Sequence, residues 1–348
     1  MKFMHYSASL NVPGAHLVES FPVLKYIPDA LAPWKRRIKL KGQEEAAVNM
    51  QLVRDVEQDM AEAQASGKSI PQSLTSRLLE ARKKDSVSFS ILSDRNFSFI
   101  PASLFGAGSD TTASTLCSAF LALATHDQTL HAAHAELDSI IGADRMPTFE
   151  DESSLPYLRA FCKEVLRWRP VAVLGGTPHA TSESDVYNGH HIPSGTTVLT
   201  NSWAVNLNEE YYPNPHHFNP LRFLDVDPSS LPYLPARYLS STPMERGKPH
   251  PSKLGHSSFG WGRRICPGAD LASNTLFIAL ARLLWTFDIK PVKGMQYDIF
   301  DYTNGFNIRP RPFKCDIRIR SPKHEEVLKR EYDNAQVFMD KFPLFKEQ

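Results

Sequence analysis

A single cysteine, Cys266, stands in a glycine-rich loop and constrains the chain more than any other residue. The loop reads FGWGRRICPG from Phe259 to Gly268, and the apolar spacing of residues 269–284 predicts a helix after it. Pro267 suits the first position of that helix, because its missing N–H would be unpaired there anyway. Cys266 is therefore predicted to lie at the positive end of a helix dipole, where a thiol ionises readily and becomes a strong ligand.

The other residues of this loop suit a flat, anionic partner. Gly260 and Gly262 permit positive φ or a close approach of the backbone, so a flat cofactor could lie against the loop. Arg263 and Arg264 supply positive charge. The alternative interpretation is a buried structural cysteine after an ordinary loop, which is the commoner role of an isolated cysteine.

Composition narrows the class of protein. The 348 residues carry 39 basic and 38 acidic side chains, a balance that gives no sign of nucleic-acid binding. The four cysteines are scattered without a C-x-x-C pair, which argues against a disulfide framework and a structural zinc site and favours a reducing, intracellular compartment. No apolar run reaches 18 residues, so the chain as given is not expected to span a membrane.

A second informative stretch is FGAGSDTTAST, from Phe105 to Thr115, inside a predicted helix that is capped by Ser93 and reaches Thr125. Gly108 and the polar residues 109–112 weaken helical hydrogen bonding, so a small ligand or water could enter there. A polar stripe between packed helices is the alternative. Pro101 is expected to kink this helix or to delay its start.

A third stretch is the predicted helix from Pro156 to Arg169, closed by Pro170. Glu164 and Arg167 stand three residues apart on one face of it. An exposed pair of this kind is common and contributes little, so E-x-x-R alone is a weak signal.

Taken together, these motifs resemble the cytochrome P-450 (haem-thiolate monooxygenase) family, in particular its members from filamentous fungi. The haem-binding loop F-x-x-G-x-R-x-C-x-G of that family is matched at five fixed positions: Phe259, Gly262, Arg264, Cys266 and Gly268. The resemblance implies that Cys266 is the axial ligand of haem iron. It also implies that Asp110 and Thr111, in a run similar to A-G-x-D-T-T, deliver protons beside the haem.

The resemblance assigns further residues. Glu164, Arg167 and Arg222 would form a structural triad that holds the segment leading to Cys266. His179 and Arg264 would meet a haem propionate. The candidate substrate contacts are Ala107, Val171, Val173, Leu174 and Phe306, although core packing is an equal interpretation for the three aliphatic residues Val171, Val173 and Leu174.

The implied fold is mainly α with small β-sheets (α+β), in a single domain over residues 1–348. Family members extend further at the N-terminus, in a part that holds a membrane anchor, a β-rich lobe and several helices. Residues 1–37 combine apolar side chains with the basic cluster 35–37, which suggests a membrane-contacting or substrate-lid segment. A core loop that leads into a helix is the alternative.

Three hypotheses on function follow. The first is a monooxygenase that uses haem b, dioxygen and electrons from NADPH, delivered by a cytochrome reductase, to hydroxylate a hydrophobic small molecule. It would act as a monomer at the endoplasmic reticulum surface, in fungal secondary metabolism or detoxification. The second is a haem enzyme that rearranges peroxides or dehydrates substrates, against which Asp110 and Thr111 argue. The third is a catalytically silent fragment.

Overall fold

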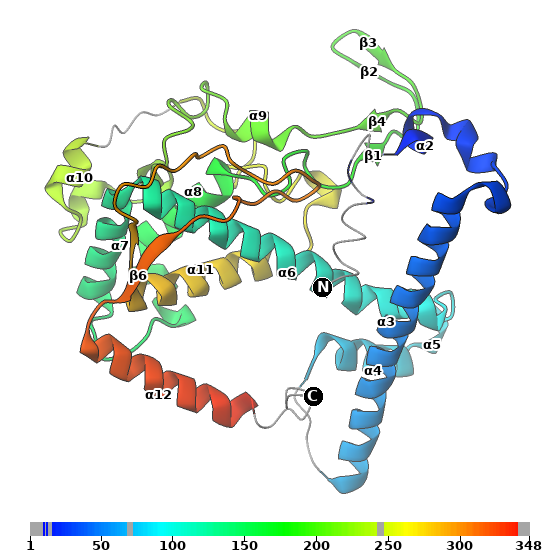
Figure 1. Ribbon diagram of the computed structural model, residues 1–348, viewed down its shortest axis with the longest axis horizontal. Coiled ribbons are helices and arrows are strands. Elements are labelled where there is room, and N and C mark those ends of the chain that lie inside the picture. Colours follow the sequence, from blue (N-terminus) through cyan, green and yellow to red (C-terminus); the bar gives the residue numbers. More distant parts are fainter. Residues whose placement is uncertain (1–9, 11, 13–15, 68–71, 242–246, 340–348) are drawn as a thin grey trace. The chain divides into compact units, whose positions relative to one another are not determined.

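A computed structural model describes residues 10, 12, 16–67, 72–241 and 247–339 of the chain (Figure 1). Contacts divide the chain into two compact units. Among the described residues, those up to Ser109 belong to the first unit and those from Asp110 to Met339 belong to the second. The single domain over residues 1–348 stays a prediction.

The first unit is helical in its described part. Its elements are α2 (Leu17–Ser20), the 3-10 turns η1 (Pro22–Tyr26) and η2 (Asp29–Leu31), α3 (Pro33–Ser66), α4 (Leu74–Lys84), α5 (Ser86–Phe89) and the start of α6 (Asp94–Thr125). Gly67 ends α3 with φ of 66°, a left-handed conformation that glycine adopts without strain. A small core of Val53, Leu79 and Phe97 joins α3, α4 and α6.

Residues 16–37 are not a core loop. Three large apolar side chains are exposed there: Phe21 just before η1, Tyr26 at its end and Leu31 at the end of η2. Their exposure contradicts the core-loop alternative. Membrane contact by this segment stays a prediction, and most of residues 1–15 lie outside the described residues. No helix in the described part of the chain is long and apolar enough to cross a membrane.

Helix α6 begins as the sequence predicts, because the hydroxyl of Ser93 accepts a hydrogen bond from the Asn96 backbone N–H at 3.2 Å. The predicted late start is wrong: Pro101 lies within a helix that has already formed at Asp94, so its missing N–H removes one bond of an established ladder. The polar centre also stays helical. There the Thr115 hydroxyl donates to the Thr111 carbonyl at 2.9 Å and is satisfied within the helix.

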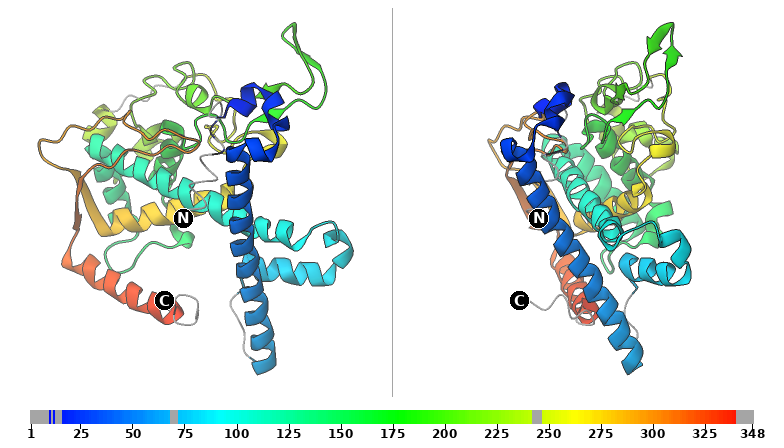
Figure 2. Two further views of the ribbon diagram at one scale, coloured as in Figure 1. Left: turned by 45° about the vertical axis from the view of Figure 1, so that its right-hand side comes forward. Right: turned by 90° about the vertical axis from the view of Figure 1, so that its right-hand side faces the viewer.

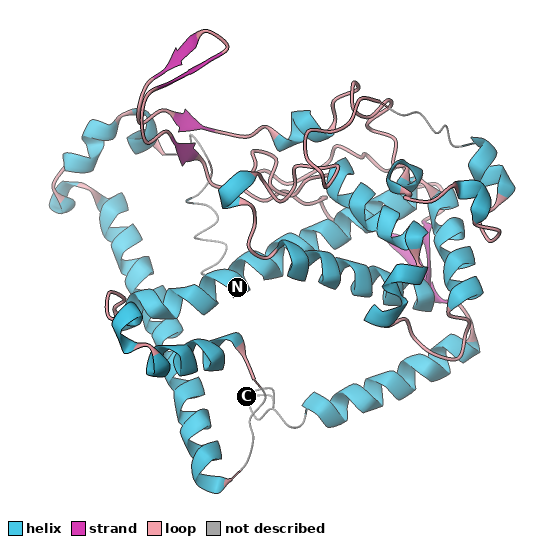
Figure 3. Ribbon diagram, turned by 180° about the vertical axis from the view of Figure 1, so that it is seen from behind, coloured by secondary structure: helices cyan, strands magenta, loops and turns pink. Residues whose placement is uncertain are grey.

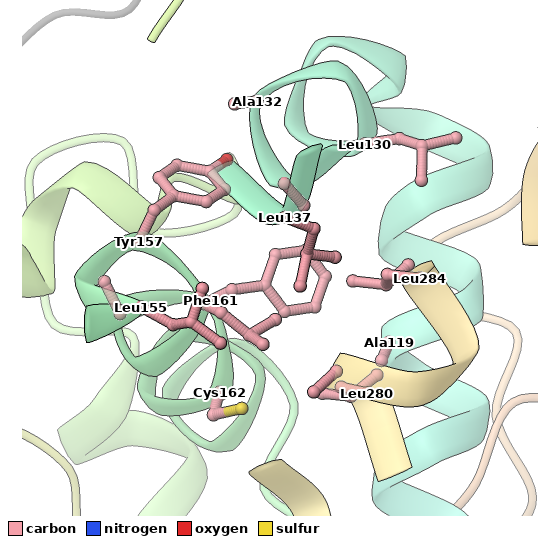
Figure 4. Close-up of a cluster of buried hydrophobic side chains, with 14 of the residues drawn as sticks. Ala119, Leu130, Ala132, Leu137, Leu155, Tyr157, Phe161, Cys162, Leu280 and Leu284 are labelled. Carbon is pink, nitrogen blue, oxygen red and sulfur yellow. The ribbon is translucent and has the colours of Figure 1, made fainter. Parts of the chain in front are cut away.

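The second unit contains the larger core. After the remainder of α6 come α7 (Asp127–Ile140), η3 (Phe149–Ser154), α8 (Pro156–Trp168), α9 (Ser202–Asn206), η4 (Pro220–Phe223), η5 (Pro228–Ser230), α10 (Ala236–Ser241), η6 (Gly262–Arg264), α11 (Ala269–Thr286) and α12 (Pro322–Met339). Figure 4 shows Phe161 of α8 facing Leu137 of α7 and Leu284 of α11, and all three are fully buried. Burial of such side chains is the main source of stability in a fold of this kind.

A buried carboxylate fixes the start of α8. The oxygens Oε1 and Oε2 of Glu136 accept the backbone N–H groups of Tyr157 and Leu158, each at 2.9 Å, and Oε1 also accepts the Tyr233 hydroxyl at 2.8 Å. These N–H groups have no partner inside the helix, so Glu136 completes the helix end from a neighbouring element. Burial nevertheless raises the pKa of Glu136.

Three antiparallel pairs make up the strands of the described residues (Figure 3). They are β1 (His179–Ala180) with β4 (Thr197–Val198), β2 (Asp185–Tyr187) with β3 (His190–Ile192), and β5 (Phe287–Pro291) with β6 (Cys315–Ile319). The β2–β3 hairpin turns at Asn188 and Gly189, both with positive φ, and projects from the rest of its unit in Figures 1 and 2. The predicted fold class, mainly α with small β-sheets, is confirmed.

Candidate functional site

The loop that ends at Cys266 is closed on itself. The Cys266 backbone N–H donates to the Phe259 carbonyl at 2.8 Å, across a turn in which Gly260 and Gly262 have φ of 78° and 57°. A side chain other than hydrogen would strain both positions. The thiol that this turn presents is exposed, so the interpretation of Cys266 as a buried structural cysteine is wrong.

Helix α11 begins later than the sequence predicts. Gly268 is its N-cap and Ala269 its first residue, whereas Pro267 was expected at the first position. The Ala269 N–H turns back to the Cys266 carbonyl at 3.3 Å, and the helical ladder starts with Ala272 bonded to Gly268 at 2.8 Å. Cys266 therefore stands two residues before the cap. A Cβ on Gly268 would lie 3.9 Å from the Cys266 Sγ, so the sulfur lies close to the helix start.

The surroundings of the thiol fit a flat apolar group. Ile265 beside it and Leu271 in the first turn of α11 are 44% and 72% exposed, which is unusual for large aliphatic side chains. A Cβ at Gly260 or Gly262 would meet nothing within 4 Å, so the space over this backbone is open. Thiolate sulfur is a ligand of haem iron, and an exposed thiol with apolar neighbours is a suitable donor.

Glu164 and Arg167 form a fully buried pair within α8. Arg167 donates from Nε to Glu164 Oε2 at 2.6 Å and from Nη2 to Oε1 at 2.8 Å. Arg222, in η4, places its Nε 3.6 Å from the same carboxylate and donates from Nη2 to the Asn214 carbonyl at 3.0 Å. The structure thus brings together the three residues expected to form a triad, and Glu164 Oε1 also accepts the Asn219 N–H at 2.8 Å.

Hydrogen bonds continue from this pair toward the cysteine loop. Arg167 Nη1 donates to the Asn206 carbonyl at 3.1 Å, and the Asn206 side-chain oxygen accepts both the N–H and the hydroxyl of Ser257, each at 2.8 Å. The Ser258 hydroxyl donates to the Leu166 carbonyl at 2.6 Å. Residues 257 and 258, directly before Phe259, are therefore anchored to α8 and α9.

His256 precedes these anchors and is almost fully buried. Its Nδ1 accepts the Ser258 N–H at 3.3 Å, and its ring meets that of Phe259 edge-on with the centroids 5.5 Å apart. Burial lowers the pKa of His256 from 6.5 to about 3, so the imidazole is neutral near pH 7.

Asp110 lies on α6 and contacts a distant turn of the second unit. Its Oδ2 accepts the Asn307 side-chain N–H at 3.3 Å, and its Oδ1 lies 3.5 Å from Nη1 of Arg309. Thr111, the other residue expected to deliver protons, is half-buried on the same helix. Ala107 lies one helical turn earlier, in the first unit.

The candidate substrate contacts differ in how far they are buried. Val171 is buried, and its carbonyl accepts the Ile308 N–H at 2.9 Å, which brings the segment after α8 to the same turn as Asp110. The Val173 carbonyl accepts the Trp203 N–H at 3.1 Å, and Leu174 is 37% exposed. Phe306 is half-buried in the turn itself.

His179 and Arg264 are both exposed. His179 pairs with Val198 through β1 and β4, and Arg264 lies in η6. Their assignment to a propionate stays a prediction.

Four residues of this arrangement were missed by sequence reasoning: Asn206, Ser257, Asn307 and Arg309. None lies in a motif. Each makes its contact with a residue 50 or more positions away, a pairing that periodicity and local propensity do not encode.

Comparison with known proteins identifies the family. The cytochrome P450 family model matches residues 1–317. Cytochrome P450 monooxygenase 58 of Postia placenta is 37% identical over 325 residues, covering 91% of this chain and 56% of the relative. Cytochrome P450 monooxygenase polD of Polytolypa hystricis is 35% identical, covering 92% of this chain and 57% of that protein. The chain thus spans little more than half the length of these relatives.

Solved structures agree with the sequence comparisons. A zebra fish cytochrome P450 structure with abiraterone is similar with a TM-score of 0.62 and 27% identity, covering 79% of this chain and 59% of that one. A second, with progesterone, has a TM-score of 0.61 at the same identity and covers 57% of that chain. By its sequence over residues 1–317 and by its fold, the chain belongs to the cytochrome P450 family.

Proposed function

We propose that the protein is a haem-thiolate monooxygenase that hydroxylates a hydrophobic small molecule. One observation carries the proposal: Cys266 presents an exposed thiol on a closed loop whose approach, residues 257 and 258, is anchored to the buried Glu164–Arg167 pair. A rigid loop with an open thiol suits a ligand that must be held in one orientation.

Several residues would hold haem b in this arrangement. Cys266 would ligate the iron, and Gly260 and Gly262 would let the ring lie against the loop. Arg264 and His179 would meet the propionates, and Ile265 and Leu271 would cover apolar parts of the ring. When bound, haem with a thiolate ligand supplies activation of dioxygen and cleavage of its O–O bond.

The remaining steps belong to protein side chains. The Asp110 carboxyl would carry protons from water into the pocket, and the Thr111 hydroxyl would accept and pass them on one residue further along α6. Val171, Val173, Leu174 and Phe306 would orient the substrate by apolar contact, which favours a hydrophobic molecule. Electrons would come from NADPH through a reductase that docks from outside.

A turnover assay tests this function. Purified protein loaded with haem is incubated with NADPH, a cytochrome reductase and a panel of hydrophobic substrates, and oxygenated product is measured. We expect product that depends on the reductase, and loss of product in Cys266→Ala. Cys117→Ala is the matched control, because Cys117 is also an exposed free thiol but lies outside the loop, and it should retain activity. Turnover with peroxide alone and none with the reductase would contradict a monooxygenase.

A further inference from the structure

Residues 301–311 form a turn that is closed by its own backbone. The Thr303 N–H donates to the Arg309 carbonyl at 2.8 Å, and the Arg309 N–H donates back to the Thr303 hydroxyl at 3.1 Å. The Arg311 N–H donates to the Asp301 carbonyl at 2.9 Å, and Tyr302 pairs with Pro310 as an antiparallel bridge. These contacts join the two arms of the turn on both sides of its tip.

This turn is tied to α6 at two places. The Tyr302 hydroxyl donates to the Ser118 hydroxyl at 3.0 Å, and Asn307 and Arg309 reach the two oxygens of Asp110. Ser118 stands eight positions after Asp110, a rise of about 12 Å along a helix. Two anchors at this separation place the turn along the helix, because a single contact would leave it free to pivot.

The same turn is tied to the segment that follows α8. The Ile308 N–H donates to the Val171 carbonyl at 2.9 Å, and Arg169 Nε donates to the Ile299 carbonyl at 3.1 Å just before the turn. Arg169 is itself fixed, since it is buried and lies over the ring of Trp168. One short element thus links Asp110, Val171 and Phe306, three residues that the proposed function uses.

We propose that Arg309, assisted by Asn307, is a positioning residue for Asp110. This inference rests on the proposed function. The two side chains hold one carboxylate oxygen each, so the charged form of Asp110 returns to the same place after every proton transfer. The carboxyl gives its proton to an acceptor in the pocket and takes a new one from water, while the Arg309 guanidinium keeps its own protons throughout. A substrate that contacts Phe306 would therefore contact the same turn that holds the Asp110 carboxylate.

The alternative is an ordinary surface ion pair. Arg309 and Asp110 are 48% and 32% exposed, and isolated pairs of that exposure contribute little. This pair differs because a second donor binds the other carboxylate oxygen and because the donors sit on a closed turn. Arg311 offers a matched control within the same turn: its Nε lies 3.2 Å from Asp301, and both side chains are more than half exposed.

Amide hydrogen exchange of the haem-free chain tests the tether. In Arg309→Ala we expect the peptide covering residues 110–117 to exchange about 2- to 5-fold faster than in the wild type, the factor that corresponds to loss of one exposed pair. Arg309→Lys should recover part of the protection, and Arg311→Ala should leave this peptide unchanged. Equal exchange in Arg309→Ala and Arg311→Ala would overturn the proposal.

Coupling of electrons to product in the haem-loaded protein tests the positioning. Arg309→Ala should divert about 2- to 5-fold more NADPH-derived electrons to hydrogen peroxide than Arg311→Ala, with Arg309→Lys in between. Faster exchange with unchanged coupling would mean that the tether is only structural and would contradict the proposal. Failure of the chain to bind haem would refute the proposed function instead, and the exchange experiment would still decide the tether.

Discussion

The buried cluster around Glu164, called the scaffold below, and the exposed surface around Cys266, called the open face, differ in the burial of their polar and apolar side chains. Glu164 and Arg167 are fully buried and bonded to each other and to backbone groups, whereas Cys266, Ile265 and Leu271 are exposed. Buried charge is tolerated only where it is paired, and large apolar side chains are commonly exposed where a partner covers them. The buried, paired charges suit a stabilising role and the exposed thiol surface suits ligand binding, and Asn206 and Ser257 join the two regions.

The largest effect is expected in the scaffold. Glu164→Ala leaves the Arg167 charge buried without its carboxylate and should lower the free energy of unfolding by about 3–5 kcal/mol. Arg145→Ala is the matched control, because Arg145 makes a similar two-point contact with Asp151 but is 49% exposed, and it should cost about 1 kcal/mol or less. Denaturant unfolding of both variants measures the difference, and equal losses would break the comparison.

Lowering the pH should reduce the free energy of unfolding through His256, which precedes the cysteine loop. His256 is neutral in the folded chain, since its pKa is lowered to about 3, and it binds a proton in the unfolded chain below its ordinary pKa of 6.5. Its contribution to stability is therefore complete above pH 6.5 and is lost as the pH falls toward 3. From pH 7 to pH 5 the loss is about 2 kcal/mol.

Denaturant unfolding of the wild type and of His256→Gln between pH 7 and pH 5 measures this contribution. Near pH 5 the free energy of unfolding of the variant should change less steeply with pH, by the equivalent of about one bound proton. His126 and His134, whose pKa values are also lowered to about 4 by burial, contribute in the same direction to the slope that remains. Identical slopes in the two proteins would show that His256 is accessible to protons.

A smaller effect is expected at the link between the two regions. Ser257→Ala removes the hydroxyl donor to the Asn206 side chain but keeps the backbone donor, so the free energy of unfolding should fall by about 0.5–1.5 kcal/mol. Haem should also dissociate faster from the loaded variant. Unchanged dissociation would show that the cysteine loop does not depend on this anchor.

The smallest effect on stability is expected on the open face. Leu271→Ala removes a side chain that is 72% exposed, so the free energy of unfolding of the haem-free chain should change by about 0.5 kcal/mol or less. The same change should weaken haem binding in a titration. A large loss of stability without haem would mean that this face belongs to the core.

Elements with local signals were predictable from the sequence. Gly67 ends α3 and Ser93 begins α6 because each acts within one turn of its own position. The start of α11 was missed by two residues, since Pro267 fits the first helical position equally well in the absence of tertiary contacts. The resemblance located Glu164, Arg167 and Arg222, but it supplied none of the residues that join them to the loop.

The partners of Asp110 could not be predicted. Asn307 lies 197 residues further along the chain, and Arg309 belongs to a turn with no recognisable motif. Their meeting depends on the backbone of the turn and on the Val171 carbonyl, which are products of the completed fold. Contacts of this kind follow from tertiary structure and not from local propensity.

The central claim, that the open face holds haem through Cys266 on an independently stable scaffold, is tested by one spectrum. Wild-type protein and Cys266→Ala are loaded with haem, reduced and exposed to carbon monoxide, after denaturant unfolding has shown equal stability without haem. We expect the red-shifted absorption band of a thiolate ligand in the wild type and its absence in the variant. A wild-type chain that stays colourless, or a variant that keeps the band, would contradict the claim.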